Sequence, residues 1–174
     1  MSTRQVSDQN DPIIESRDQL AAPMIKGEKP KERWRIGTEH EKFVYRTSDH
    51  RAPSYDEPGG IRDLLMALTR FGWEPVIEGG HVIALAGSDG TVSLEPAGQL
   101  ELSGAPLENL HQTCAETGRH LKQVKEVGAE IGLGFLGVGM WPYKTRAELP
   151  VMPKGRYKII LKHMPRVGSI GLDM

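Results

Sequence analysis

Two glutamates one residue apart are the first side chains that could do chemistry. In the stretch RIGTEHEKFVYR, Glu39 and Glu41 lie on either side of His40. The surrounding residues suit an extended strand, in which side chains two residues apart point to the same face. Both carboxylates would then lie side by side, where like charges repel. His40 would point to the opposite face, which favours a packed or solvated histidine over a metal ligand.

A second acidic pair occurs in the stretch SLEPAGQLELSGAP. Glu95 and Glu101 are six residues apart, so an uninterrupted strand would again place them on one face. Pro96 and Gly98 bend the path and could bring both carboxylates toward the first pair. Converging carboxylates need cations, and hard oxygen ligands suit Mg²⁺ or Mn²⁺. The alternative is a pair of ordinary acidic positions on exposed strand faces.

Basic residues enter an apolar segment in the stretch MPKGRYKI. Lys154, Arg156 and Lys158 lie beside a glycine that leaves room for a ligand. A guanidinium can make a bidentate contact with a carboxylate or a phosphate, so Arg156 is a candidate for substrate binding. The alternative is a solvated basic turn.

Two further features do not indicate function. The stretch GLGFLG, residues 132–137, satisfies the G-x-G-x-x-G pattern of dinucleotide-binding proteins. That pattern requires a strand before it and a helix after it, whereas here a helix should precede and a strand should follow. The sequence therefore predicts a helix-to-strand connection without a dinucleotide. Cys114 lies within a helical pattern without a basic partner, which predicts a small core residue.

The composition is typical of one soluble globular domain with a sizeable core. The chain has 174 residues and a net charge of -1, which gives no reason to expect nucleic acid or a membrane as a partner. The polar N-terminus has no apolar segment that would serve as a signal or a membrane span. A single cysteine cannot form an internal disulfide, which favours a cytoplasmic location.

Strands that occur in runs beside separate helices predict an α+β fold, with a largely antiparallel sheet and helices packed on one face. Apolar spacing of three and four residues predicts the helices, and Asp-Gly between apolar runs predicts a hairpin. Residues 1–28 are expected to form an arm and a helix, and residues 29–174 the folded domain. The expected helices are 13–26, 61–71, 107–131 and one that a loop enters within residues 143–165; the expected strands are 32–46, 81–87, 91–96, 98–106 and 134–141.

The blocks WRIGTEHEKF, SLEPAGQLELSGAPLENLHQTCAE, MPKGRYKI and MPRVGSIGLDM occur in this order along the chain. With these blocks, the sequence resembles the plant-type glutamate–cysteine ligases, which also occur in proteobacteria. The resemblance implies ATP-dependent ligation of the γ-carboxylate of L-glutamate to the amine of L-cysteine through an acyl phosphate, the first step of glutathione biosynthesis. It also implies a fold like that of glutamine synthetase. Ala97 and Leu100 depart from the glycine and phenylalanine expected there, and both look tolerable.

The resemblance also implies roles for individual residues. Glu39 and Glu41 would bind Mg²⁺, with Mn²⁺ as the alternative metal. Arg156 would bind the substrate carboxylate, and Lys154 would lie beside it. ATP is then the co-substrate. The remaining metal ligands implied are Glu95 and Glu101.

The resemblance leaves the state of this chain open, because members of the family are more than twice as long. We therefore expect an incomplete catalytic domain that is inactive alone, with a second chain as one way to complete it. The alternatives are a non-catalytic remnant, or a related γ-glutamyl ligase with another amine acceptor.

Overall fold

A computed structural model of the chain describes residues 13–88 and 90–172. The N-terminal arm expected from the sequence therefore lies outside the described residues, apart from its last part. Asp89 of the expected hairpin turn and residues 173–174 of the final glycine-rich block also lie outside them.

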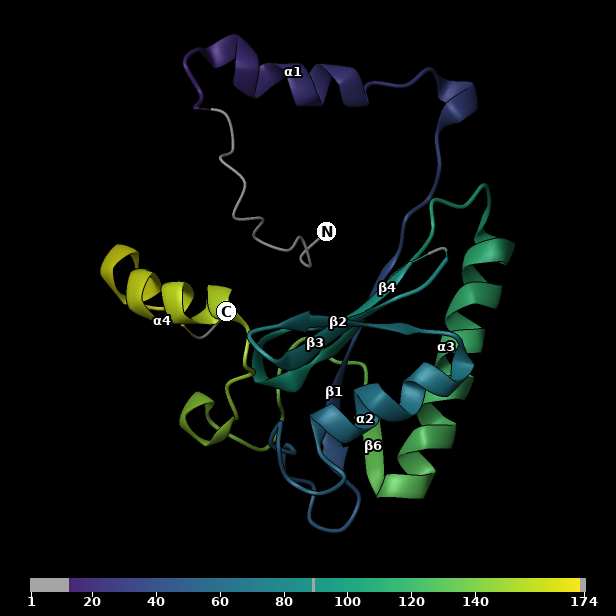
Figure 1. Cartoon of the computed structure of the whole chain (residues 1–174), viewed down its shortest axis with the longest axis vertical. Coiled ribbons are helices and arrows are strands. Elements are labelled where there is room, and N and C mark those ends of the chain that lie inside the picture. The colour runs from purple at the N-terminus through teal and green to yellow at the C-terminus, as the bar shows by residue number, and fades with distance from the viewer. Residues whose placement is uncertain (1–12, 89, 173–174) are drawn as a thin grey trace.

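One antiparallel sheet organises the chain (Figure 1). Its strand order is β2-β3-β4-β5-β1-β6, and every neighbouring pair is antiparallel. This confirms the expected α+β fold with an antiparallel sheet. The strands are β1 (Glu39–Arg46), β2 (Glu74–Glu78), β3 (His81–Ala86), β4 (Thr91–Leu94), β5 (Leu100–Ser103) and β6 (Leu133–Leu136).

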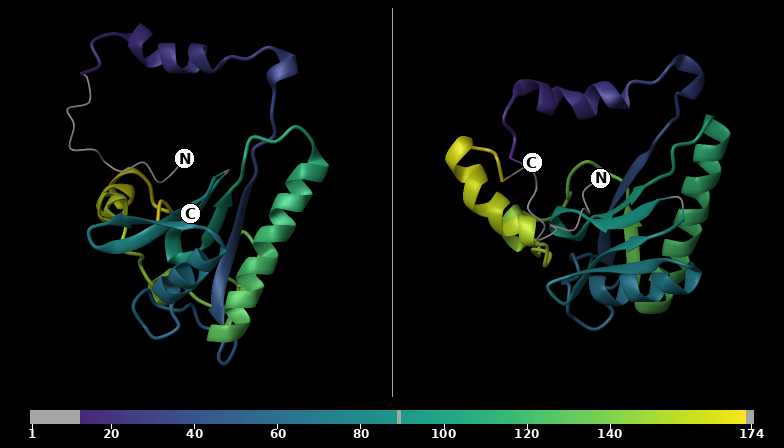
Figure 2. Two further views of the ribbon diagram at one scale, coloured as in Figure 1. Left: turned by 45° about the vertical axis from the view of Figure 1, so that its right-hand side comes forward. Right: turned by 45° about the horizontal axis from the view of Figure 1, so that its top comes forward.

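Two helices cover one face of the sheet, and a third lies on the other side (Figures 1 and 2). The covering helices are α2 (Ile61–Leu68) and α3 (Leu110–Ile131). On the other side, α4 (Gly155–Val167) meets the body of the chain through its first turn. The N-terminal helix α1 (Arg17–Gly27) lies apart from the sheet and contains no buried residue. The face of the sheet that α2 and α3 leave uncovered is therefore the face that α4 approaches.

The core lies between the sheet and its helical layer. The apolar residues of α2 repeat at intervals of three and four, and the four that face the sheet are fully buried: Ile61, Leu64, Leu65 and Leu68. They pack against alternate residues of the strands, including Val44, Leu85, Val92, Leu94, Leu100 and Leu102. Burial of each leucine stabilises the fold by roughly 1.5–3 kcal/mol. Because side chains alternate along a strand, this packing fixes which strand residues point to the opposite face.

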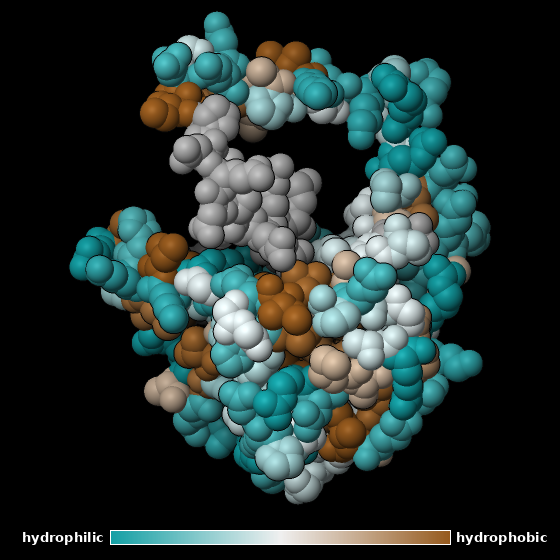
Figure 3. Space-filling model, viewed as in Figure 1, coloured by the Kyte–Doolittle hydropathy of each residue, from teal (hydrophilic) through white to brown (hydrophobic). Residues whose placement is uncertain are grey.

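Apolar side chains also remain on the surface of α1 and α4 (Figure 3). Leu20, Met24 and Ile25 of α1 are exposed, and so are Ile159 and Leu161 of α4. The only buried residue of α4 is Tyr157, in its first turn. None of the described helices is long and apolar enough to cross a membrane.

The predicted helix-to-strand connection at the glycine run is confirmed. The last residue of α3 is Ile131, Gly132 caps it in the left-handed conformation (φ 74°), and β6 begins at Leu133. Only glycine adopts this conformation without strain. The glycine run therefore follows a helix and leads into a strand, which is the reverse of the order that a dinucleotide-binding motif requires.

Four details differ from the sequence prediction. Cys114 is exposed, so the prediction of a core residue is wrong. Leu110, expected on the same face, is 71% exposed, because α3 has buried residues only from His120 onward. The edge strand β2 was not predicted, and the strand expected from residue 32 begins only at Glu39.

Candidate active site

The predicted glutamates gather on the uncovered face of the sheet. In the register of β1 and β5, Glu41 lies opposite Glu101 and Glu39 opposite Ser103. Cross-strand partners share a face, so these three carboxylates belong to one surface. The next residue, Lys42, points instead into the helical layer, where it is buried. The sequence parity of Glu39 and Glu41 is therefore confirmed.

The other three carboxylates are close enough to affect the protonation of Glu41. Partial burial of its carboxyl group raises the pKa of Glu41, although the residue as a whole is exposed, and the negative charges of Glu101, Glu95 and Glu39 raise it further. Glu101 is only 5% exposed, and the Ser103 hydroxyl donates a hydrogen bond to it. The repulsion expected from the spacing of the glutamates is thus present in the folded chain.

Glu95 joins this face at a bend between β4 and β5. It precedes the short 3₁₀ helix Pro96–Gly98, in which both Ala97 (φ 62°) and Gly98 (φ 76°) are left-handed. The chain closes on itself there, because the Glu95 N–H donates to the Gln99 carbonyl at 2.8 Å. The bend predicted from the proline and glycine is confirmed.

The basic residues at the start of α4 meet Glu95. Arg156 Nη2 donates a hydrogen bond to the Glu95 carboxylate, and Lys154 Nζ lies 3.6 Å from it. Lys154 is 3% exposed and also donates to the Leu94 carbonyl at 2.5 Å. Burial lowers the pKa of Lys154, and the charge of Glu95 opposes this effect. Lys154 therefore fastens α4 to the end of β4, so the alternative of a solvated basic turn is wrong for this residue.

Arg156 retains one donor, its Nε, that no described residue uses. Its guanidinium lies 5.3 Å above the ring of Tyr157, which fixes its plane. Its Nε is buried, and no described residue accepts a hydrogen bond from it. A substrate carboxylate or phosphate would satisfy such a donor.

The donor set fits a hard divalent cation, although its side chains are not gathered around one point. Among residues 13–88 and 90–172, no three acidic, histidine or cysteine side chains stand ready to hold a metal ion. Glu101 is engaged by Ser103 and Glu95 by Arg156, whereas Glu39 and Glu41 are exposed. Mg²⁺ is nevertheless the kind of ion that relieves repulsion between neighbouring carboxylates, and the charges of Glu101, Glu95 and Glu39 add to the effect of burial in raising the pKa of Glu41.

Behind the acidic face lies a buried pair that the sequence analysis did not predict. Lys42 Nζ donates to the His40 and Leu100 carbonyls and lies 3.0 Å from His120 Nε2. Burial lowers the pKa of Lys42 to about 8, while Glu101 and Glu41 oppose the change. Burial and the charge of Lys42 lower the pKa of His120 to about 3. The parity that exposes Glu41 also buries Lys42, so the signal was present in the sequence.

His120 makes the fold sensitive to acid. Its pKa is about 3 when folded and 6.5 in a free histidine, so the unfolded chain binds the extra proton between these values. The contribution of the neutral His120 to the free energy of unfolding is therefore fully present above pH 6.5, and it is lost as the pH falls toward 3. We expect His120→Gln to reduce the loss of unfolding free energy between pH 7 and pH 5 by about 2 kcal/mol. Urea denaturation at both pH values measures this, with the exposed His111→Gln on the same helix as the control. Equal pH dependence in both variants would contradict the role of His120.

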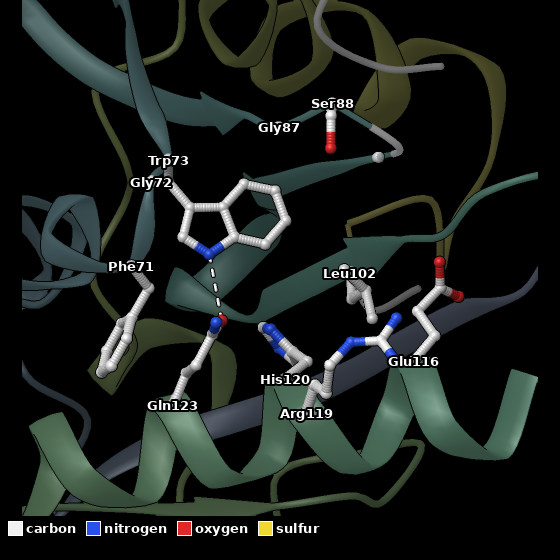
Figure 4. Close-up of a pocket in the computed structure, with 11 residues that line it drawn as sticks. Phe71, Gly72, Trp73, Gly87, Ser88, Leu102, Glu116, Arg119, His120 and Gln123 are labelled. Carbon is white, nitrogen blue, oxygen red and sulfur yellow. Dashed lines mark hydrogen bonds between the residues drawn. The ribbon is translucent and has the colours of Figure 1, made fainter.

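Two pockets lie near this region, on opposite sides of the sheet. The first, between α3 and the turn of β3 and β4, is polar, with Glu116, Arg119 and His120 along one wall (Figure 4). Trp73 closes its other end and donates to Gln123 at 3.0 Å. This pocket lies on the helical side, away from the acidic face.

The second pocket is aromatic and was not predicted from the sequence. It has a volume of about 190 Å³ and is lined by Tyr45, His50, Leu136, Trp141, Pro142 and Tyr143. Tyr45 belongs to β1 and has the same parity as Glu39 and Glu41, so the pocket opens on the acidic face. Its residues come from three separate stretches of the chain, which is why no local motif indicated it.

Comparison with known proteins extends these findings. The family described as "Glutamate-cysteine ligase family 2 (GCS2)" matches residues 35–174. Glutamate–cysteine ligase A, chloroplastic, of Oryza sativa subsp. japonica is 53% identical over 160 residues, which cover 91% of this chain and 32% of the rice protein. The chloroplastic glutamate–cysteine ligase of Brassica juncea is also 53% identical over 160 residues, or 30% of its length. The chain thus spans about a third of the length of the curated relatives it matches.

Proposed function

Because the chain belongs to glutamate–cysteine ligase family 2, we propose that it contributes to a carbon–nitrogen ligase that joins the γ-carboxylate of L-glutamate to the amine of L-cysteine at the expense of ATP. The observation that carries the proposal is the register that places Glu41 opposite Glu101, within electrostatic reach of Glu39 and Glu95. Two anionic substrates, ATP and glutamate, must react here, and an acidic face suits them only together with cations.

In this proposal, Glu39, Glu41, Glu95 and Glu101 hold Mg²⁺ or Mn²⁺. The bound ion supplies positive charge beside the phosphate being transferred. Glu95 lies at the border between the acidic face and the basic start of α4, where it contacts Lys154 and Arg156. We therefore propose that it both binds the metal ion and holds these two basic residues in place.

Arg156 is proposed to bind a carboxylate of L-glutamate through its guanidinium, whose Nε has no acceptor among the described residues. Its stacking on Tyr157 and its bond to Glu95 hold the guanidinium in place before substrate arrives. Lys154 is buried and bound to the Leu94 carbonyl, so we propose that it positions Arg156 and leaves the contact with substrate to it. Both residues are therefore retained as parts of the substrate site, in different roles.

The activity is tested by completing the chain with a relative. Residues 35–174 replace the matched segment of the rice ligase, and formation of γ-glutamylcysteine and ADP is measured with ATP and Mg²⁺. We expect turnover within about tenfold of the rice enzyme, because half of the matched residues are identical. The control is the same chimera with Glu41→Gln.

The same assay separates the competing interpretations. Product with another amine, at a higher rate than with L-cysteine, would indicate a related γ-glutamyl ligase. A chimera that folds but forms no product with any amine would support the non-catalytic interpretation. The unmodified chain of 174 residues is assayed beside it, since we propose that it is inactive alone. A second chain that completes the fold and a cytoplasmic location stay predictions.

A further inference from the structure

We propose that the aromatic pocket beside the acidic face binds the purine base of the nucleotide. The proposal rests on the proposed function, because it takes ATP as the co-substrate and the acidic face as the place where its terminal phosphate reacts. The pocket is lined by Tyr45, His50, Leu136, Trp141 and Tyr143.

The position of the pocket suits a base. Tyr45 follows Glu41 by four residues on one continuous strand, and both point to the same face. Four residues of strand span roughly 13 Å. This is close to the reach of an extended ribose and triphosphate, so a nucleotide with its last phosphate at Glu41 would place its base near Tyr45.

The walls of the pocket suit a flat ring. The rings of His50 and Tyr143 are nearly parallel, with centroids 6.5 Å apart and an interplanar angle of 20°. The Phe43 and Trp141 rings meet edge to face at 5.2 Å, which holds Trp141 over β1. Tyr45 can lie flat against β6 because Gly134 opposite it has no side chain; a Cβ there would lie 2.3 Å from the tyrosine ring. Aromatic faces bind every base through stacking.

Polar groups are available for the edges of a base. His50 offers ring nitrogens, and Tyr45 and Tyr143 offer hydroxyls. The indole Nε1 of Trp141 is buried without an acceptor among the described residues. Apolar walls with a few polar groups are typical of sites for small ligands.

Cysteine fits this pocket less well than a base does. Its amine must attack the acyl phosphate next to the acidic face, and a pocket roughly 13 Å along the strand is too far for that. A volume of about 190 Å³ would also remain mostly empty around a cysteine side chain. The geometry therefore favours the nucleotide base over the amine acceptor.

Calorimetry of the full chain tests the pocket with four probes in Mg²⁺: ATP, inorganic triphosphate, adenosine and L-cysteine. We expect ATP to bind about tenfold more tightly than triphosphate, and Tyr143→Ala to remove this difference while triphosphate binding stays unchanged. Tyr143 is 74% exposed, so its replacement should leave the fold intact, and His50→Ala is a second exposed variant. Trp34→Ala, an exposed aromatic residue outside the pocket, is the control and should have no effect.

The outcomes separate the pocket from the proposed function. Equal binding of ATP and triphosphate, or ATP binding that Tyr143→Ala leaves unchanged, would overturn the pocket and leave the acidic face as proposed. If neither ATP nor triphosphate binds, the proposed role of the acidic face is contradicted, and adenosine then tests the pocket alone. Adenosine binding that Tyr143→Ala abolishes supports the pocket, and no adenosine binding overturns it. Binding of L-cysteine that depends on Tyr143 would assign the pocket to the acceptor and overturn the inference.

Discussion

Glu41→Gln is expected to lower γ-glutamylcysteine formation by the completed ligase by about 100-fold or more. The substitution keeps the shape of the side chain and removes its charge. Because the charges of Glu101, Glu95 and Glu39 already surround Glu41, its carboxylate contributes directly to the field that attracts a cation. The loss should persist at saturating Mg²⁺ if the charge acts in the transition state, and should shrink there if it acts only in metal binding.

The same substitution should make the apo protein more stable at neutral pH. The pKa of Glu41 is raised in the folded chain, so this group stabilises the fold at low pH and loses that contribution as the pH rises. A neutral glutamine removes the repulsion, and urea denaturation at pH 7 should show a higher unfolding free energy. Glu108→Gln, an exposed glutamate paired with Arg35, is the control for both measurements. An inactive Glu41→Gln protein that is also less stable would indicate misfolding in place of lost cation binding.

Glu95→Gln is expected to destabilise the fold by about 3 kcal/mol, because removing one partner of a buried ion pair leaves the other charge without compensation. Lys154 has a side chain that is 2% exposed and depends on Glu95 as its nearest negative charge. The loss should decrease at high pH, where Lys154 becomes neutral. Chemical denaturation measures it, with the exposed Glu39→Gln, which should change stability by less than about 0.5 kcal/mol, as the matched control.

A double substitution sharpens this prediction. Lys154→Met removes the buried charge, so Glu95→Gln added to it should cost much less than Glu95→Gln alone. If the two effects simply add, the pair is not coupled, and Glu95 contributes to stability in another way. If Glu95→Gln changes neither stability nor turnover, both of its proposed roles are wrong.

The sequence predicted the parts of the site that follow from local spacing. The parity of Glu39 and Glu41 placed both carboxylates on one face, and the Asp-Gly turn and the capping Gly132 placed the hairpin and the end of α3. These features depend on residues that are close in the chain, so a periodic pattern is enough to find them.

Long-range contacts account for what the sequence did not predict. The bond between Arg156 and Glu95 joins residues 61 positions apart, and no spacing rule indicates such a pair. Cys114 is exposed because α3 is buried only from His120 onward, and a helical pattern does not show where the sheet that the helix packs on stops. The strand β2 was missed because Pro75 and terminal glutamates hide an edge strand, which needs few apolar residues.

Because α4 is attached to the sheet only through its first turn, this turn and the rest of the helix differ in local stability. Tyr157 donates to the Leu94 carbonyl and is the last residue of α4 that is buried. Residues beyond it have few tertiary contacts to protect their amides, so local opening there costs little free energy. Arg156 lies on the protected side of this boundary. The orientation of its guanidinium is therefore set by the sheet, and the remaining turns of α4 can fray or bind elsewhere without moving it.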